Sequence, residues 1–295
     1  MWRLDSSLGQ SLDRQLARGP EDWEQTFRQM ALFDLAGDIQ LGFFLAYYRN
    51  FAIPSGSATL VRNGEIPARP MKRSIDTGLV IYELIASGLD SERGRQMTTL
   101  LNRVHQHVPG SHEDFLYVLM TLLVVPIRWA DRYGWRKPTR TERDAATRFF
   151  GELGARMHIL DIPVTFEAAE KCFDDYERRR VAPSPAGKTL MGATVQVFQS
   201  MQPKILHPVT KRMIATMLDD AQLAAALGLP RSTWCSRRAL NAGIAIRNAI
   251  RRHTPLSAIP SFIPGQAAPP VYPGGYDMAA IGPLNVMGPR NRNAS

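Results

Sequence analysis

Repeated helical patterns, several of them preceded by a helix start signal, constrain this chain more than any other feature of its sequence. Ser111 with Asp114, and Thr139 with Glu142, have the spacing of a capping box, in which each side chain satisfies a free backbone N–H of the first helical turn. No alternating apolar and polar pattern predicts a strand. We therefore expect an all-α fold with a single large multi-helix domain over residues 1–253.

Residues 254–295 have a different composition. Prolines and glycines are dense there and the apolar periodicity is lost. Such a composition buries too little apolar surface to offset the entropy of ordering. The sequence thus predicts a flexible Pro/Gly-rich tail after the helical domain. The chain as a whole is 44% hydrophobic, which is ample for a core without disulfides or structural metal.

The N-terminus and the cysteines indicate a reducing compartment. Cys172 and Cys235 are far apart and form no CxxC pair, so neither a disulfide framework nor a thiolate zinc site is expected. No apolar run of a signal peptide follows the first residues. The longest apolar stretch, 115–127, is about half of what a bilayer requires, so we interpret it as part of a buried helix with a kink at Pro126. We expect a cytoplasmic protein without a transmembrane helix.

Positive charge is concentrated in the last part of the chain. The formal net charge is +9, but eight arginines and a single acidic residue, Asp277, follow residue 230, leaving 28 basic against 26 acidic residues before that point. The chain also lacks the basic and aromatic motifs of RNA- and DNA-binding modules. We therefore expect no nucleic-acid partner.

The segment 231–253 carries six arginines and no acidic residue, interleaved with Trp234, Leu240, Ile244 and other apolar side chains. Such a helix can lie on an anionic membrane. The alternative is a solvated basic face packed on the domain. The sequence leaves both interpretations open.

The helical pattern over 92–108 directs His105 toward the core, since His105 shares a face with Met97, Leu101 and Val104. His107 is about 200° further around the helix and points elsewhere. If one of the two is an inward-facing ligand, His105 is favoured. Taken alone, the pattern equally describes a core histidine whose ring nitrogens are hydrogen-bonded to the protein.

Several short segments follow one another in an order that is more specific than any one of them. They are Arg73-Ser74-Ile75-Asp76-Thr77, Leu101-Asn102-Arg103-Val104-His105, Glu113-Asp114-Phe115-Leu116-Tyr117, Pro126-Ile127-Arg128-Trp129, Tyr133-Gly134-Trp135-Arg136, Thr141-Glu142 and Gly154-Ala155-Arg156-Met157-His158-Ile159. In this order they resemble the MpaB-like oxygenases, which share a catalytic domain with the latex-clearing rubber oxygenases. The resemblance covers roughly residues 34–228.

The resemblance implies a helical domain that encloses a haem b pocket and uses dioxygen to cleave a carbon–carbon double bond in a hydrophobic, isoprenoid or lipid-like substrate, leaving two carbonyl products. It implies that His105 is the proximal iron ligand, and that Arg73 and Thr77 lie near the haem on its distal side. Four residues apart, these two share a helix face and can reach bound dioxygen or a propionate. The residues alone favour a helix-entry arginine and an N-terminal threonine cap, and the ordered series of segments is what shifts the interpretation to a haem site. The expected pocket walls are Tyr82, Phe115, Leu119 and Leu122.

Three positions depart from the family pattern. Asp76 precedes Thr77 where rubber oxygenases have a lysine, which agrees better with the MpaB-like branch and calls a distal base of that kind into question. Val125 stands where that branch usually has glutamate, and His112 where asparagine is common. We expect these departures to affect substrate handling.

Two rival functions remain open at this point. The first is a non-haem metal enzyme that uses His105, His107 and His112, although helical phase points the first two apart. The second is a non-catalytic helical protein of the same fold that binds a membrane surface or a protein partner through 231–253. Phosphate-binding loops, dinucleotide fingerprints, nucleophile elbows and zinc-protease motifs do not occur in the sequence.

Overall fold

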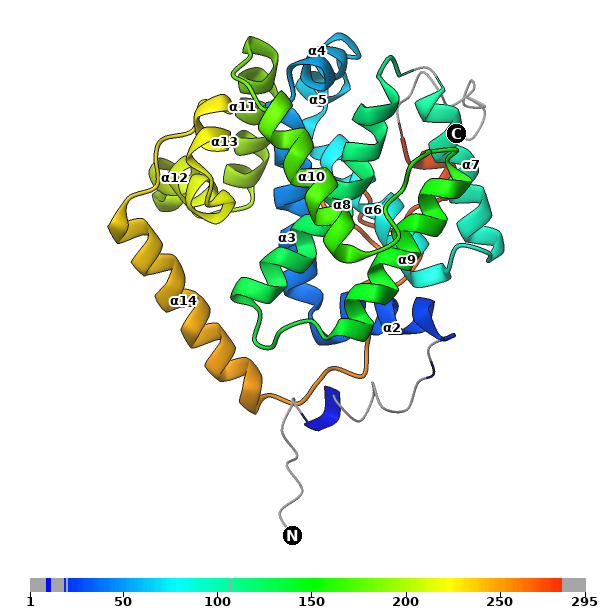
Figure 1. Ribbon diagram of the computed structural model, residues 1–295. Helices are drawn as coiled ribbons and strands as arrows, with labels where there is room; N and C mark the ends of the chain where they lie inside the picture. The colour runs from blue at the N-terminus through cyan, green and yellow to red at the C-terminus, as the bar shows by residue number, and fades with distance from the viewer. Residues whose placement is uncertain (1–8, 12–18, 20, 107, 283–295) are drawn as a thin grey trace.

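The computed structural model describes residues 9–11, 19, 21–106 and 108–282, and over these residues the chain is an assembly of helices (Figure 1). In chain order they are α2 (Trp23–Gln29), the π-helical η1 (Met30–Asp34), α3 (Ala36–Arg49), η2 (Asn50–Ala52), α4 (Pro54–Arg62), α5 (Glu65–Ala68), α6 (Pro70–Ser87), α7 (Glu92–His105), α8 (His112–Tyr133), α9 (Arg140–Arg156), α10 (Phe166–Arg180), α11 (Pro185–Ser200), η3 (Lys204–Leu206), α12 (His207–Leu218), α13 (Ala221–Ala226), α14 (Trp234–His253) and η4 (Met278–Ala280). Within these residues, β pairing is limited to one antiparallel bridge between Ala268 and Tyr272. The prediction of an all-α fold is confirmed.

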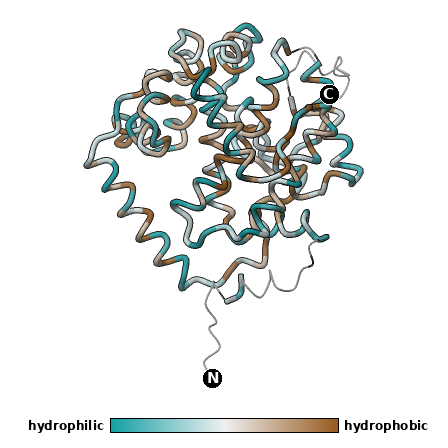
Figure 2. The backbone as a smooth tube through the Cα atoms, in the orientation of Figure 1, coloured by the Kyte–Doolittle hydropathy of each residue, from teal (hydrophilic) through white to brown (hydrophobic). Residues whose placement is uncertain are grey.

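Helices α3 and α8 pack together at the centre of the bundle, with α9 and α10 against α8 (Figure 1). Both predicted capping boxes are present: Ser111 caps α8 with Asp114, and Thr139 caps α9 with Glu142. Figure 2 shows apolar segments running through this central region. The local start signals in the sequence thus define the two helices that form much of the core.

Helix α8 continues through Pro126, the residue at which the sequence predicts a kink. Pro126 is buried at the crossing with α3 and faces Gly42. A Cβ atom on Gly42 would lie 2.3 Å from the Pro126 Cα atom, far inside van der Waals contact. Glycine at position 42 is therefore what allows the two central helices to approach this closely.

We expect Gly42→Ala to destabilise the fold by at least about 1–3 kcal/mol, because a backbone atom of α8 has to move to admit the new methyl group. Gly37→Ala is the matched control in the same helix, since no atom lies within 4 Å of its hypothetical Cβ. That change is expected to be neutral or to stabilise by up to about 1 kcal/mol through helix propensity. Urea unfolding of both variants measures the difference. Equal stabilities would contradict the close crossing.

Helix α7 is shorter than the predicted segment 92–108. It begins at Glu92 as expected, with Ser91 as its N-terminal cap, but ends at His105, with Gln106 as its C-terminal cap residue. Pro109 and Gly110 follow within a few residues, and neither favours continuation of a helix. The consequence is that His105 occupies the last helical position, beside the connection to α8.

The C-terminal segment 254–282 differs from the flexible tail that the sequence predicts at this place. Tyr272 donates a hydrogen bond from its hydroxyl to Asp76 of α6 (2.7 Å), and Tyr276 does so to Glu83, about two turns further along the same helix (2.6 Å). Ile281 is fully buried. The low apolar content of this segment is offset by hydrogen bonds to two buried carboxylates, which composition does not reveal.

In the described part of the chain no single helix is long and apolar enough to cross a membrane. One bent pair, Trp23–Asp34 with Ala36–Ala52, passes that test by length and composition, with an angle of 96° between its two parts. Many side chains of this pair, such as Phe27 and Ile39, belong to the protein core.

Candidate functional site

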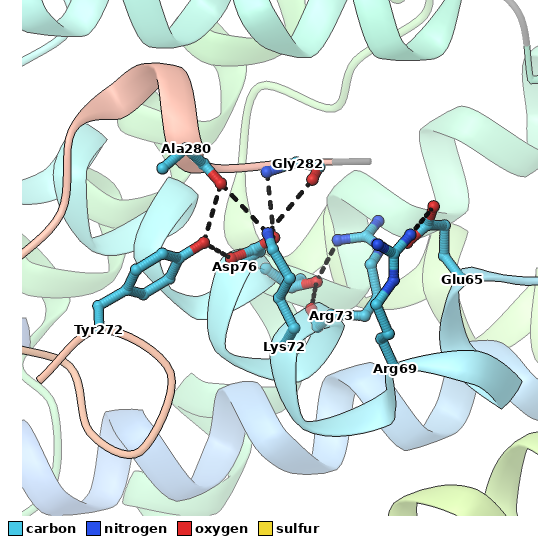
Figure 3. A network of polar contacts seen from close by, with 9 residues as sticks. Glu65, Arg69, Lys72, Arg73, Asp76, Tyr272, Ala280 and Gly282 are labelled. Atoms are coloured by element: carbon cyan, nitrogen blue, oxygen red, sulfur yellow. Dashed lines mark hydrogen bonds and ion pairs between the residues drawn. The ribbon is translucent and has the colours of Figure 1, made fainter. Parts of the chain in front are cut away.

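Arg73 and Thr77 lie one turn apart on α6, as its fourth and eighth residues. The Arg73 guanidinium donates to the Thr77 hydroxyl (Nη1 to Oγ1, 2.6 Å), and that hydroxyl donates to the Arg73 carbonyl (2.7 Å), so the two side chains form one unit (Figure 3). Because α6 begins at Pro70, Thr77 is not an N-terminal cap. The interpretation of Thr77 as a helix cap therefore does not describe its geometry, whereas Arg73 does lie in the first turn of α6.

Arg73 differs from the two cations beside it on α6 in having no carboxylate partner. Arg69 pairs with Glu65 through Nη2 and Oε1 at 2.5 Å, and Lys72 pairs with Asp76 (Figure 3). Among the described residues, no Asp or Glu lies within ion-pair distance of Arg73, which is half-buried. A partly buried guanidinium without a counterion is costly unless an anion or polar ligand completes its hydrogen bonds.

His105 lies close enough to Arg73 for the two side chains to interact electrostatically. Burial lowers the pKa of His105, a hydrogen bond with the Leu101 carbonyl acts in the opposite direction, and the positive charge of Arg73 lowers the pKa further. The Nδ1 atom of His105 is 2.8 Å from the Leu101 oxygen. Since a carbonyl only accepts, Nδ1 carries the proton, and the lone pair of the neutral ring is on Nε2. This is the tautomer that a ligating histidine requires.

Two buried hydroxyl groups that the sequence analysis does not single out lie in the same region. Tyr47 of α3 and Ser74 of α6 face each other closely enough for their hydroxyls to interact, although within the described residues neither oxygen has a partner at full hydrogen-bonding geometry. Burial raises the pKa of Tyr47, and the charge of Arg73 opposes that shift. Buried polar atoms without partners are rare in native proteins and indicate a place for a water or ligand. Their only signal in the sequence is a hydroxyl on an otherwise apolar helix face.

Asp76 and His112, which the sequence analysis also names, have contacts of a different kind from those of Arg73 and His105. Asp76 is buried on α6, where it accepts hydrogen bonds from Tyr272 and from the Gly282 backbone N–H (3.1 Å). His112 is exposed at the start of α8, with Nε2 3.0 Å from the Leu160 carbonyl. His107 lies outside the described residues. Asp76 therefore anchors the C-terminal segment, and His112 contacts the connection between α9 and α10.

The described side chains contain no group of three or more His, Cys, Asp or Glu residues that could hold a metal ion. This covers His105 and His112 but leaves His107 untested. Two hollows on the structure lie along α14, and neither is lined by Arg73, Thr77 or His105.

The expected pocket walls are apolar and packed. Phe115 contacts His105 edge to face, with ring centroids 5.7 Å apart. Tyr82 packs between Phe43 and Phe262, at centroid distances of 5.9 and 5.4 Å. Leu119 is buried and Leu122 is partly buried against the core. Phe115 is thus the wall residue with a direct contact to the site.

The sequence and the fold both match known proteins. A family profile described as "ER-bound oxygenase mpaB/B'/Rubber oxygenase, catalytic domain" matches residues 35–252, from the cap of α3 into α14. The chain belongs to this family. The resemblance inferred from the ordered segments is confirmed, and the C-terminal segment that binds Asp76 and Glu83 lies outside the matched region.

Individual members of the MpaB/rubber oxygenase family are distant relatives. The chain is 26% identical to the ER-bound oxygenase mpaB' of Penicillium brevicompactum over 193 residues, which are 59% of this chain and 46% of that protein. It is 25% identical to mpaB of Penicillium roqueforti (strain FM164) over 193 residues, 59% of this chain and 65% of that protein. The chain therefore spans about half to two thirds of the length of these relatives. The structure of latex clearing protein LCP in the closed state matches with a TM-score of 0.57 and 17% identity, over 82% of this chain and 70% of that one, which shows a shared fold.

Several segments that carry the family resemblance have structural roles here. Arg128 binds Glu170 and Asp174 of α10, each at 2.7 Å. Arg136 bridges Asp34 and Glu142. These motifs of the MpaB/rubber oxygenase family hold helices together, whereas the segments containing Arg73 and His105 form the candidate site.

Proposed function

We propose that this chain is a haem b-dependent oxygenase that cleaves a carbon–carbon double bond in a hydrophobic, isoprenoid or lipid-like substrate. The observation that carries the proposal is the pairing of His105, whose Nε2 lone pair is available, with the uncompensated cation of Arg73 nearby. Membership of an oxygenase family supports the class of reaction. Haem dependence and the substrate class go beyond what family membership supports, and they are the content of this proposal.

His105 is the residue that would hold the iron of haem b through Nε2. Its Nδ1 proton remains on the Leu101 carbonyl, which fixes the plane and tautomer of the ring. Its lowered pKa keeps the imidazole neutral at pH 7 and below, so protons compete less with the metal. When bound, haem b supplies the iron at which dioxygen is activated.

Arg73 and Thr77 would act together as donors toward a polar oxygen, either that of dioxygen or that of a haem propionate. Arg73 has N–H groups to spare beyond the one on Thr77, and no carboxylate neutralises its charge within the described residues. Tyr47 and Ser74 offer two further hydroxyls close by. A site of low polarity would strengthen each of these interactions.

The substrate would meet an apolar surface. Phe115 lies against His105, and the expected walls are otherwise aliphatic or aromatic. Oxidative cleavage of an alkene by one dioxygen yields two carbonyl groups that account for both oxygen atoms, without an external reductant for the overall reaction. The protein contributes ligation, orientation and exclusion of water.

The experiment that tests this function is an absorption spectrum of the purified, haem-reconstituted chain, oxidised and dithionite-reduced, followed by carbonyl detection with an isoprenoid alkene under oxygen. A Soret band and carbonyl products are expected. A band without products would contradict alkene cleavage only. Iron without a Soret band would favour the metal enzyme using His105, His107 and His112. A protein that binds neither haem nor iron would favour the non-catalytic alternative.

We expect Arg73→Leu to lower kcat by about 100-fold, in the range seen when one donor to a developing oxyanion is removed. Arg73→Lys should retain part of the activity because it keeps the charge but not the fork of donors. Arg95→Leu, on the exposed face of α7, is the matched control and should leave kcat unchanged. Steady-state oxygen consumption measures all three. If Arg73→Leu kept the wild-type kcat, Arg73 would have no role in the reaction.

The cellular setting is proposed from the cysteines and the surface. Cys172 and Cys235 are both free, which fits the reducing cytoplasmic compartment that the sequence predicts. The enzyme would reach a hydrophobic substrate at a membrane, and we expect the segment 231–253 to make the peripheral contact with that membrane.

A further inference from the structure

Helix α14 lies along the outside of the bundle and none of its twenty residues is buried (Figure 1). One face holds it to the body: Arg247 reaches Asp38 (2.8 Å) and the Tyr133 carbonyl (2.7 Å), and Asn248 binds the same carbonyl (3.0 Å). Leu240 and Ile244 pack partly against the core on this side. The attachment uses one side of the helix and leaves the opposite side to the surroundings.

The opposite side of α14 is an unpartnered apolar face. At 100° per residue, Ala239, Ala242, Ile246, Ala249 and Ile250 fall within an arc of about 100°. All five are exposed, and Ile246 and Ile250 each expose 63% of their surface. Figure 2 shows the resulting alternation of apolar and polar residues along the helix. Two isoleucines with this much exposed surface on a regular helix indicate that this face contacts an apolar partner.

An arginine and a tryptophan border this face. Arg238 falls beside the apolar arc on the helical wheel, and its guanidinium lies 4.8 Å from the ring centroid of Trp234, which is 70% exposed. Arg252 lies further around the helix and donates to the Trp135 carbonyl of the bundle (3.3 Å). No Asp or Glu occurs in the sequence between Asp220 and Asp277. An apolar strip edged by arginine and tryptophan has the composition of a helix that lies in the plane of a bilayer.

The charge decides between the partners that such a face could take. A second copy of the chain, docked α14 against α14, would bring together two helices of like charge with no acidic residue on either. A surface of anionic phospholipid headgroups offers the opposite charge at the edges and acyl chains under the isoleucines. The observations therefore favour the lipid surface.

We propose that α14 is an interfacial docking helix that seats this protein on bilayers containing anionic phospholipid, with Ile246 and Ile250 entering the apolar layer and the flanking arginines binding headgroups. The inference is independent of haem and of the proposed reaction. It adds a binding surface on α14, along the outside of the bundle, formed by residues other than Arg73 and His105 (Figure 1).

The test is co-sedimentation of the full chain with vesicles of phosphatidylcholine alone or with about 30% phosphatidylserine, at salt concentrations of about 0.1 M and 0.5 M. We expect binding to the anionic vesicles at low salt, at least about tenfold weaker binding to the neutral ones, and loss at high salt. An environment-sensitive fluorophore on the exposed Cys235, the second residue of α14, should shift to the blue on binding.

Two double variants separate the apolar from the charged contribution. Ile246→Asn with Ile250→Asn is expected to weaken binding at least about tenfold, and Arg231→Gln with Arg238→Gln about 25-fold, at about fivefold for each arginine, equivalent to ~1 kcal/mol each. Val164→Asn (90% exposed, between α9 and α10) and Arg140→Gln are the matched controls and should bind as wild type. Circular dichroism confirms that the variants fold.

The proposal is overturned if the wild-type chain does not bind anionic vesicles at low salt, or if both double variants bind like wild type. It is also overturned if sedimentation velocity shows a dimer that the Ile246→Asn, Ile250→Asn variant abolishes, since the partner would then be a second copy. A His105→Ala chain that lacks haem should bind vesicles normally, so failure of the haem proposal leaves this result unaffected.

Discussion

Replacing His105 by glycine is expected to abolish the Soret band of the reconstituted protein, since it removes the iron ligand and leaves a space of imidazole size at the end of α7. External imidazole, at about millimolar concentration, should enter that space and restore part of the band, because the Leu101 carbonyl remains there to orient it. Absorption titration with haem, with and without imidazole, measures the effect.

His112→Gly is the matched control for this variant. His112 is exposed at the first residue of α8 and binds the Leu160 carbonyl, away from Arg73. Its loss should leave haem binding unchanged. A Soret band that survives in His105→Gly without imidazole, or that disappears in His112→Gly, would contradict the assignment of His105 as the ligand.

The same substitution has a second readout that needs no haem. The folded-state pKa of His105 lies below the usual value of about 6.5, so between these two values the unfolded chain binds more protons than the folded one. The free energy of unfolding of the wild-type apoprotein should therefore fall as the pH drops through this window. His105→Gly should lack that part of the pH dependence in urea unfolding at a series of pH values.

Arg136→Met is expected to destabilise the protein by about 3–5 kcal/mol, because it strands two buried carboxylates. Arg136 is nearly buried and donates to Glu142 (Nη2 to Oε1, 2.6 Å) and to Asp34 (3.1 Å). Glu142 also accepts from the Thr139 backbone in the capping box of α9, so the loss reaches the start of that helix. Urea unfolding at pH 7 measures the change.

Arg140→Met provides the comparison within the same helix start. Arg140 pairs with Asp144 at 3.8 Å and its side chain is 95% exposed, so its removal should change stability by less than about 0.5 kcal/mol. A small effect at pH 7 would show that the buried carboxylates do not depend on Arg136.

Much of the fold could be predicted because its signals are local. The caps at Ser111 and Thr139 lie next to the helices that they start, and both boundaries were found correctly. The end of α7 was wrong by three residues, since apolar periodicity continues to Val108 while the backbone does not. The packing of 254–282 on α6 could not be predicted, because it depends on tyrosines meeting carboxylates far away in the sequence.

The candidate site could be predicted in part. Helical phase and family resemblance together indicated Arg73, Thr77 and His105, and these are the residues that interact. Resemblance alone did not separate site residues from structural ones, since Asp76 belongs to the anchor of the C-terminal segment. Tyr47 was missed because nothing in an apolar helix reveals which hydroxyl lacks a partner after folding.

The two tyrosines that bind α6 have a consequence for the order in which the protein can mature. Tyr272 and Tyr276 stand 196 and 193 residues after their partners, Asp76 and Glu83. Both carboxylates have cationic partners nearby in the sequence, Lys72 and Arg93, whereas the two tyrosines are synthesised only after most of the helices that pack around α6. The helices can therefore collect around α6 with each carboxylate paired to a cation, and the tyrosine hydrogen bonds are added in a later, separate step.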